Sequence, residues 1–234
     1  MKKKIKTKSS FYDDKVVIKP WGYEYVVYRD KNDLSVTMLH IDFNKSTSLH
    51  CHPNKKSGFV LLKGKAEFQL GLWKKRSEIH SSPSKRMIAR GLFHKIKAAS
   101  KDGVMALEFE TPVDKNDLIR FKDNYGRQQK FYEGKKYTKV IDKNHLRFKK
   151  PTSRVRQKFR INKTLLSIEE HKNFKKLLKN KPSTIFAILN GSISDKYGRS
   201  LLSYGDIIRT NDLKTLSKVF NIKKKLGVLK INKI

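Results

Sequence analysis

Three histidines in this chain have the spacing that metal chemistry requires. His50 and His52 stand two residues apart, and on a β-strand alternate side chains point to the same face. His94 follows Gly91, which we expect to make the turn that returns the next strand to that face. Neutral imidazole is a ligand for Zn, Fe and Ni. The pattern predicts a divalent metal site (Fe, Mn, Ni or Zn) formed by His50, His52 and His94; the alternative is a set of core histidines that only form hydrogen bonds.

Two carboxylates are placed to work beside such a site. Glu108 and Glu110 lie on one face of a strand expected over residues 104–110. Either could serve as a metal ligand or move a proton as a general acid or base. We therefore take Glu110 and Glu108 as the candidate catalytic residues.

Short strands must position these groups. Segments rich in β-branched and aromatic residues alternate with polar, Gly or Pro breaks, which favours an antiparallel barrel or sandwich. The expected strands cover residues 16–18, 23–28, 36–43, 58–62, 66–72, 87–88 and 104–110.

The second half of the chain is organised differently. A short helical turn is expected over Asp114–Phe121, and residues 129–152 are interpreted as a linker ending near Pro151. An apolar stripe over Ile168–Leu178, with Ser167 as N-cap, predicts a helix. Asn190–Gly191 predicts a hairpin turn between two strands. This succession of strands and turns suggests a second barrel, related to the first by duplication, that has lost its histidines. A small α+β appendage is the alternative.

Several of these segments resemble a known superfamily. Ser48–His52 followed by Gly58–Gly64 looks like the first cupin motif, and Arg90–His94 looks like the second. Lys19–Glu24 and Asp117–Arg127 are similar to segments of type II phosphomannose isomerases and of the cupin ends of mannose-1-phosphate guanylyltransferases. The resemblance covers residues 15–127.

The resemblance implies an all-β bicupin fold. A cupin barrel, which is a double-stranded β-helix or jelly roll, would occupy residues 1–128, and a degenerate cupin-like β domain would occupy residues 153–234. It also implies a homodimer. The chain departs from the motifs at Ser57, where the usual Glu ligand is expected, and at Ala89, where the second motif usually has Pro.

The implied function is a metal-dependent reaction on a sugar phosphate or nucleotide sugar, such as aldose–ketose isomerisation in surface polysaccharide biosynthesis. A non-catalytic sugar-binding protein with a regulatory or scaffolding role is the main alternative, and a three-histidine Fe(II) dioxygenase is a further one. The residues expected to bind substrate are Ser48, Lys56, Ser57, Arg90 and Lys95.

The charge of the chain bears on its partners. Its 55 Lys and Arg residues against 21 Asp and Glu give a formal net charge of +34. Such a field attracts anions, and the anion could be a small substrate or a nucleic acid. Lys far outnumbers Arg, and specific nucleic-acid recognition relies on Arg, so nucleic acid is the lesser expectation. A single cysteine and the lack of an apolar leader or span predict a cytoplasmic protein without membrane contact.

The remaining motifs have plainer interpretations. Cys51 should point away from the two neighbouring histidines into the core. Asp123–Arg127 recurs loosely as Asp195–Arg199; the second copy is interpreted as turn chemistry, and the first is left open between a turn and a substrate contact. The histidines interpreted as surface or structural groups are His40, His80, His145 and His171.

Overall fold

The computed structural model describes residues 13–31, 33–73, 77–127 and 135–234. Nearly all of its regular structure is antiparallel β-sheet, and its one α-helix in these ranges is α1 (Thr210–Leu216). No helix in the described part of the chain is long and apolar enough to cross a membrane.

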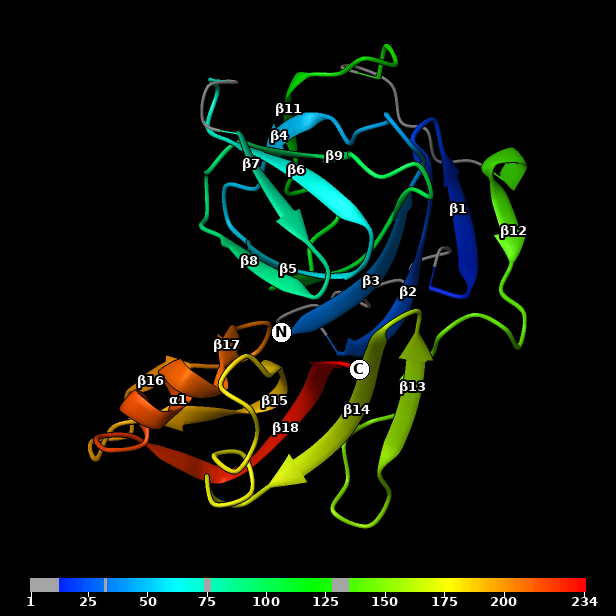
Figure 1. The fold of residues 1–234 in the computed structure, drawn as a ribbon. Helices are drawn as coiled ribbons and strands as arrows, with labels where there is room; N and C mark the ends of the chain where they lie inside the picture. Colours follow the sequence, from blue (N-terminus) through cyan, green and yellow to red (C-terminus); the bar gives the residue numbers. More distant parts are fainter. Residues whose placement is uncertain (1–12, 32, 74–76, 128–134) are drawn as a thin grey trace, which may run out of the picture.

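Two sheets form a barrel from the first half of the chain (Figure 1). The larger sheet has the order β12 (Thr138–Val140), β1 (Lys15–Lys19), β2 (Gly22–Asp30), β3 (Leu34–Ile41), β10 (Val104–Thr111), β5 (Lys56–Lys63), β8 (Ser84–Ile88). The smaller sheet has the order β11 (Ile119–Lys122), β4 (Leu49–Cys51), β9 (His94–Ala98), β6 (Lys65–Leu70), β7 (Ser77–Ser81).

The strand order identifies the barrel as a jelly roll. The run β3-β10-β5-β8 in one sheet faces β4-β9-β6-β7 in the other, so the chain crosses repeatedly between two sheets. Apolar side chains from both sheets, among them Phe59, Phe68 and Ile96, fill the space between them. The expected strands of this half are confirmed, and both histidine segments lie on neighbouring strands of the smaller sheet.

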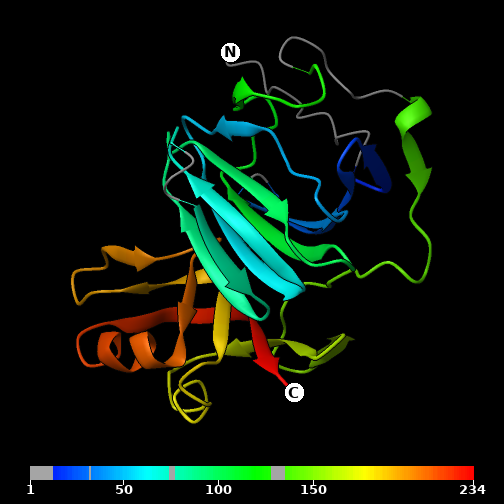
Figure 2. The same cartoon turned by 45° about the horizontal axis from the view of Figure 1, so that its top comes forward.

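A third sheet forms the second unit. Its order is β13 (Gln157–Ile161), β14 (Thr164–His171), β18 (Asn221–Lys233), β15 (Ile185–Ser194), β16 (Ser200–Leu202), and β17 (Ile207–Arg209) also pairs with β15. The sheet packs on the outside of the larger barrel sheet, and Figures 1 and 2 show it as the yellow-to-red part of the ribbon below the barrel. One buried cluster joins the two units, with Val60 and Phe109 from the barrel and Leu166 and Leu229 from the third sheet.

The helix predicted over Ile168–Leu178 is wrong. Residues 164–171 form β14, which is hydrogen-bonded to β13 on one side and β18 on the other. Leu166 and Ile168 face the shared core, while Ser167 and Glu169 are buried on the opposite face. In a strand buried on both faces, apolar and polar residues do not alternate as they do in a half-exposed strand. The apolar residues of this segment therefore fitted the spacing of a helix.

Two other local predictions are also wrong. The segment expected to be a helical turn contains strand β11, because residues 119–122 complete the edge of the smaller sheet beside β4. Asn190–Gly191 is not a hairpin turn, since β15 continues through both residues with register shifts against β18. Gly191 has φ +79, and the Asn190 side chain accepts a hydrogen bond from the Gly227 amide at 2.8 Å, so the pair forms a bulge. The hairpin turn lies further on, at Asp195–Arg199.

Part of the segment predicted as a linker belongs to the barrel sheet. β12 pairs with β1 through Val17↔Thr138 and its neighbours. Further on, the Phe148 amide donates to the Val27 carbonyl at 3.0 Å. Residues 138–148 therefore follow the barrel surface before the chain enters the second unit.

Candidate metal centre

The barrel brings the three predicted histidines together. His50 on β4 lies directly opposite His94 on β9, and His52 follows β4 immediately. The imidazole centroids are 4.4 Å apart for His50 and His94, 5.0 Å for His50 and His52, and 5.3 Å for His52 and His94. One ring nitrogen from each residue lies within 4.8 Å of the others.

Each imidazole is oriented by a backbone carbonyl. The Nδ1 atoms of His50, His52 and His94 lie 2.9, 2.6 and 3.0 Å from the carbonyl oxygens of Ser48, Asp117 and Leu92, respectively. A carbonyl only accepts, so these contacts assign the proton to Nδ1 and leave the lone pair on Nε2. Metal-bound histidines usually donate their other ring N–H to a carbonyl or carboxylate in this way.

The inward-facing nitrogens have no hydrogen-bond partner among the described residues. His52 Nε2 and His94 Nε2 are both buried and unsatisfied. A buried polar atom without a partner is costly, and in a native protein it calls for a ligand, an ion or water. Three neutral imidazoles with converging lone pairs are a donor set suited to a divalent transition metal. The residues therefore fit the predicted metal.

Burial keeps these imidazoles neutral. It is the largest cause that lowers the pKa of His50 and His52; the Lys55 ammonium adds to it at both, and the neighbouring imidazoles add to it at His50. The pKa of His94 falls to about 4, again chiefly because of burial. Neutral imidazole is the form that coordinates a metal.

The loop after His52 is held by a carboxylate that sequence reasoning missed. The Asp117 side chain accepts hydrogen bonds from the Asn54 amide at 3.0 and 3.1 Å and from the Lys55 amide at 2.8 Å. Burial raises the pKa of Asp117, but these hydrogen bonds outweigh burial, and the pKa is lowered overall. Asp117 thus fixes the loop through its side chain and His52 through its backbone carbonyl.

The two candidate carboxylates lie beside His52. Glu108, Glu110 and His52 each offer a ligand atom within 4.8 Å of the other two. In the β10–β5 ladder Glu110 stands opposite Ser57, the position at which the motif would place its Glu ligand. The Glu110 carboxylate therefore lies on the strand next to Ser57, at the directly opposite cross-strand position.

The environments of the two carboxylates differ. Burial and the nearby Glu110 charge raise the pKa of Glu108 well above its usual range. Glu110 forms an ion pair with Lys55, and this partner lowers its pKa despite burial. Lys55 is 4% exposed and also donates to the Asp114 carbonyl at 3.0 Å. The pKa values of the two neighbouring carboxyl groups are therefore shifted in opposite directions.

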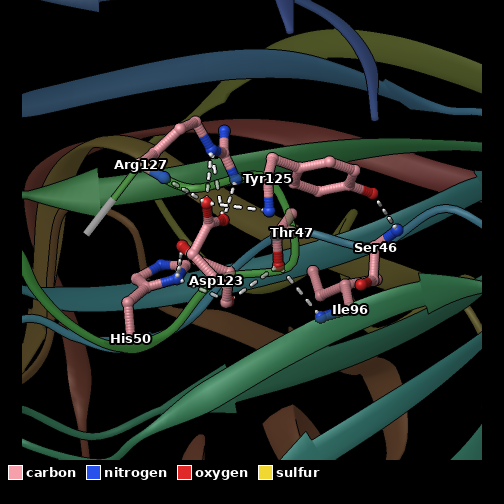
Figure 3. Close-up of polar contacts among 8 residues, drawn as sticks. Ser46, Thr47, His50, Ile96, Asp123, Tyr125 and Arg127 are labelled. Carbon is pink, nitrogen blue, oxygen red and sulfur yellow. Dashed lines mark hydrogen bonds and ion pairs between the residues drawn. The ribbon is translucent and has the colours of Figure 1, made fainter. Parts of the chain in front are cut away.

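A turn from the end of the barrel braces the strand that carries His50 (Figure 3). The Ser46 amide donates to the Tyr125 hydroxyl at 3.3 Å, and Thr47 Oγ1 accepts from the Ile96 amide at 3.1 Å. Asp123 accepts from the Arg127 amide at 2.8 Å and pairs with its guanidinium. The motif at 123–127 is a turn around a buried Asp123–Arg127 pair, and Arg127 also borders the site.

Its second copy uses the same bonds. Asp195 accepts from the amides of Tyr197 and Arg199, both at 2.9 Å, and Gly198 has φ +82. Here the arginine side chain is 79% exposed, so the copy is a surface turn. The turn interpretation of the second copy is confirmed.

His50 and His52 line an open pocket with a volume of about 140 Å³. Trp21 and Leu39 give it an apolar wall, and both carboxylates face it. Its other charged lining groups are Lys19, Glu24, Lys55, Lys115, Arg120 and Arg127. Positive charge therefore outnumbers negative charge around the pocket.

Among the residues expected to bind substrate, the structure places only Ser48 in this pocket. Lys56 points away and pairs with Asp206 of the second unit at 2.6 Å. Ser57 is buried at 1% exposure, Arg90 is exposed, and Lys95 lies on β9; none of these three lines the pocket. Alternation explains the difference between Lys55 and Lys56, because adjacent residues at the start of β5 face opposite sides.

The cationic residues that do line the pocket come from segments distant in sequence. Arg127 lies in the motif that was left open as a substrate contact, whereas Lys115 and Arg120 lie in the segment predicted as a helical turn. Cys51 is buried and free, as predicted. His171 is also buried, where it bonds to Glu169 at 3.1 Å, so it is structural.

Comparison with known proteins does not assign this chain to a protein family. No family model matches the chain, and no curated protein does. Three solved structures illustrate the structural likeness. An uncharacterized conserved protein with a double-stranded β-helix domain from Klebsiella pneumoniae has a TM-score of 0.37 and 16% identity, over 42% of this chain and 82% of that one. A putative sugar phosphate isomerase from Acidithiobacillus ferrooxidans has a TM-score of 0.32 and 14% identity, over 35% and 52%. The capsular polysaccharide assembling protein CapF from Staphylococcus aureus has a TM-score of 0.41 and 13% identity, over 46% and 34%.

These likenesses carry no function with them. The strand order by itself makes the first unit a double-stranded β-helix, followed by a second β unit. The predicted all-β fold class is confirmed.

Proposed function

We propose that this protein is a metal-dependent enzyme that binds a divalent ion with His50, His52 and His94 and acts on a small sugar phosphate. One observation carries the proposal: three imidazoles, each oriented through Nδ1 by a carbonyl, offer nitrogens within 4.8 Å of one another, and two of them, His50 and His52, line a cationic pocket. A bound divalent ion would act as a Lewis acid that polarises a carbonyl oxygen of the substrate.

The two carboxylates suit proton transfer between adjacent carbons. Burial raises the pKa of Glu108, which favours its protonated form, and the Lys55 ammonium lowers the pKa of Glu110, which favours its ionised form. Two titratable groups whose pKa values are driven apart are the usual mark of an acid and a base in one site. Glu110 is then the base that removes a proton from a carbon beside the carbonyl, and Glu108 is the acid that protonates the oxygen.

Pocket size and charge favour the substrate class. A cavity of roughly 150 Å³ holds a benzene ring, so a pocket of this volume matches a single sugar unit better than a whole nucleotide sugar. Lys115, Arg120 and Arg127 supply positive charge for the phosphate. The likeness of Lys19–Glu24 and Asp117–Arg127 to phosphomannose isomerases makes mannose 6-phosphate the first compound to test.

The test measures metal and turnover in the same preparation. Protein purified without an affinity tag should contain close to one equivalent of a transition metal, and the His50→Ala/His52→Ala variant should lose it. The control is His80→Ala/His145→Ala, because these residues bond only to Glu78 and Asp142 outside the site.

Aldose–ketose conversion of sugar 6-phosphates, followed by NMR, should require the metal. Absence of metal in folded wild-type protein would refute the proposal. Metal with sugar phosphate binding but no turnover would instead favour a non-catalytic sugar-binding protein.

A further inference from the structure

The buried lysine beside the histidines has a role that the metal-site motif does not include. Lys55 comes three residues after His52, and its ammonium group pairs with Glu110 inside the pocket. It also lies close enough to His52 to lower the pKa of that imidazole. A buried ammonium requires a strong partner, and Glu110 supplies it.

This ion pair engages a carboxylate that lies within reach of one of the three histidines, His52. Glu110 stands opposite Ser57, where the Glu ligand of the motif is missing, and offers an oxygen within 4.8 Å of the His52 nitrogen. Lys55 is held from a second side by the Asp114 carbonyl at 3.0 Å, and Asp117 fixes its backbone amide at 2.8 Å. The ammonium is therefore fixed in place beside Glu110.

We infer that Lys55 withdraws Glu110 from the metal, so that only three neutral imidazoles hold the ion and its charge is left for an anionic group of the substrate. The inference rests on the proposed metal site. A neutral donor set with open coordination positions binds anions directly, whereas a carboxylate ligand would cancel part of the ion's charge.

Four proteins separate this inference from simpler explanations: wild type, Lys55→Met, the double variant Lys55→Met/Glu110→Gln, and Lys56→Met. Methionine keeps most of the lysine volume without its charge. Lys56→Met is the matched control, because the neighbouring lysine pairs with Asp206 on the other side of β5. The affinity of each protein for Co²⁺ is measured by chelator competition, and the coordination by the visible absorption spectrum of bound Co²⁺.

In Lys55→Met the freed Glu110 should become a ligand. We expect the Kd for Co²⁺ to fall by about tenfold or more, with a changed visible spectrum, and the affinity of the Co²⁺ form for inorganic phosphate to drop. The double variant should return to the wild-type affinity and spectrum, because a neutral pair replaces an ion pair and neither state provides a carboxylate ligand. Lys56→Met should stay within about twofold of wild type.

Other outcomes would overturn the inference. A double variant that binds Co²⁺ much more weakly than wild type would show that Glu110 is already a ligand. A double variant as tight as Lys55→Met would show that the gain comes from removing a charge alone. An unchanged Lys55→Met protein refutes the inference while leaving the metal site intact. Wild-type protein that binds no Co²⁺ refutes the metal site itself.

Discussion

At the scale of single residues, the site depends on which nitrogen of each histidine carries the proton. Carbonyl oxygens of Ser48, Leu92 and Asp117 accept from Nδ1, and none of these acceptors can be recognised from residue type. The sequence identified the three histidines because the H-x-H spacing places both on one face. It did not distinguish Lys55, which lines the site, from Lys56, which does not.

The neutral histidines make the metal-free protein sensitive to acid. His94 has a pKa of about 4 when folded and an ordinary value near 6.5 when unfolded, so the unfolded chain binds more protons between these values. Stability should therefore fall as pH decreases through this range, and His94 alone should contribute about 2 kcal/mol of the loss between pH 7 and 5.

Urea unfolding with EDTA present, at pH 7 and pH 5, checks this expectation. His94→Gln should show a smaller loss of stability between the two pH values than wild type. Equal losses in the two proteins would contradict the assignment of His94 as a buried neutral base.

At the scale of elements, close approach of neighbouring strands sets the pocket wall. Gly22 begins β2 with φ +140, and a Cβ there would lie 2.0 Å from the carbonyl oxygen of His40 on β3. The residue before it, Trp21, is 4% exposed and lines the pocket. The glycine is therefore needed to bring Trp21 and Lys19 to the site at the start of the β2–β3 ladder.

Gly22→Ala should lower the free energy of unfolding by about 3 kcal/mol or more, because the clash is with backbone that cannot move without breaking the ladder. Gly71→Ala is the control: its φ is also positive, at +76, yet a Cβ there meets nothing within 4 Å. It should cost only about 1 kcal/mol, the penalty for left-handed backbone. Urea titration of both variants measures the difference, and similar losses would argue against a steric role for Gly22.

At the scale of the whole molecule, the two units are joined by polar contacts and a common hydrophobic core. The Thr164 hydroxyl donates to the Leu62 carbonyl at 2.8 Å, and Lys56 pairs with Asp206 across the contact. Leu229 of β18 is fully buried in the same cluster as Val60 and Phe109. The second unit therefore covers the outer face of the strands that carry Glu108, Glu110 and Lys55.

Loss of packing in the second unit should destabilise the barrel. Leu229→Ala should lower the free energy of unfolding by about 2–5 kcal/mol. Both tryptophans, Trp21 and Trp73, lie in the first unit, so their fluorescence reports on the barrel.

In a Trp73→Phe background, the urea midpoint followed by Trp21 fluorescence should shift together with the midpoint followed by circular dichroism. An unshifted fluorescence midpoint would show that the barrel folds independently of the third sheet.

Net charge also acts on the whole molecule. A formal charge of +34 destabilises the compact state by self-repulsion, and salt screens that repulsion. Raising NaCl from 0.01 to 0.15 M shortens the Debye length from about 30 to 8 Å and should raise the melting temperature. A melting temperature that falls over this range would show that specific ion pairs outweigh the general repulsion.

The sequence by itself determined the histidine set, the two flanking carboxylates and most strands of the barrel, because these follow from side-chain alternation and from turn residues within a few positions. Only the tertiary structure decided that residues 164–171 are a strand, since both faces are buried by elements distant in sequence. It also decided that Lys55 and Arg127, and not Lys56 and Arg90, face the site. Those choices depend on strand register and on long-range ion pairs, which no local pattern encodes.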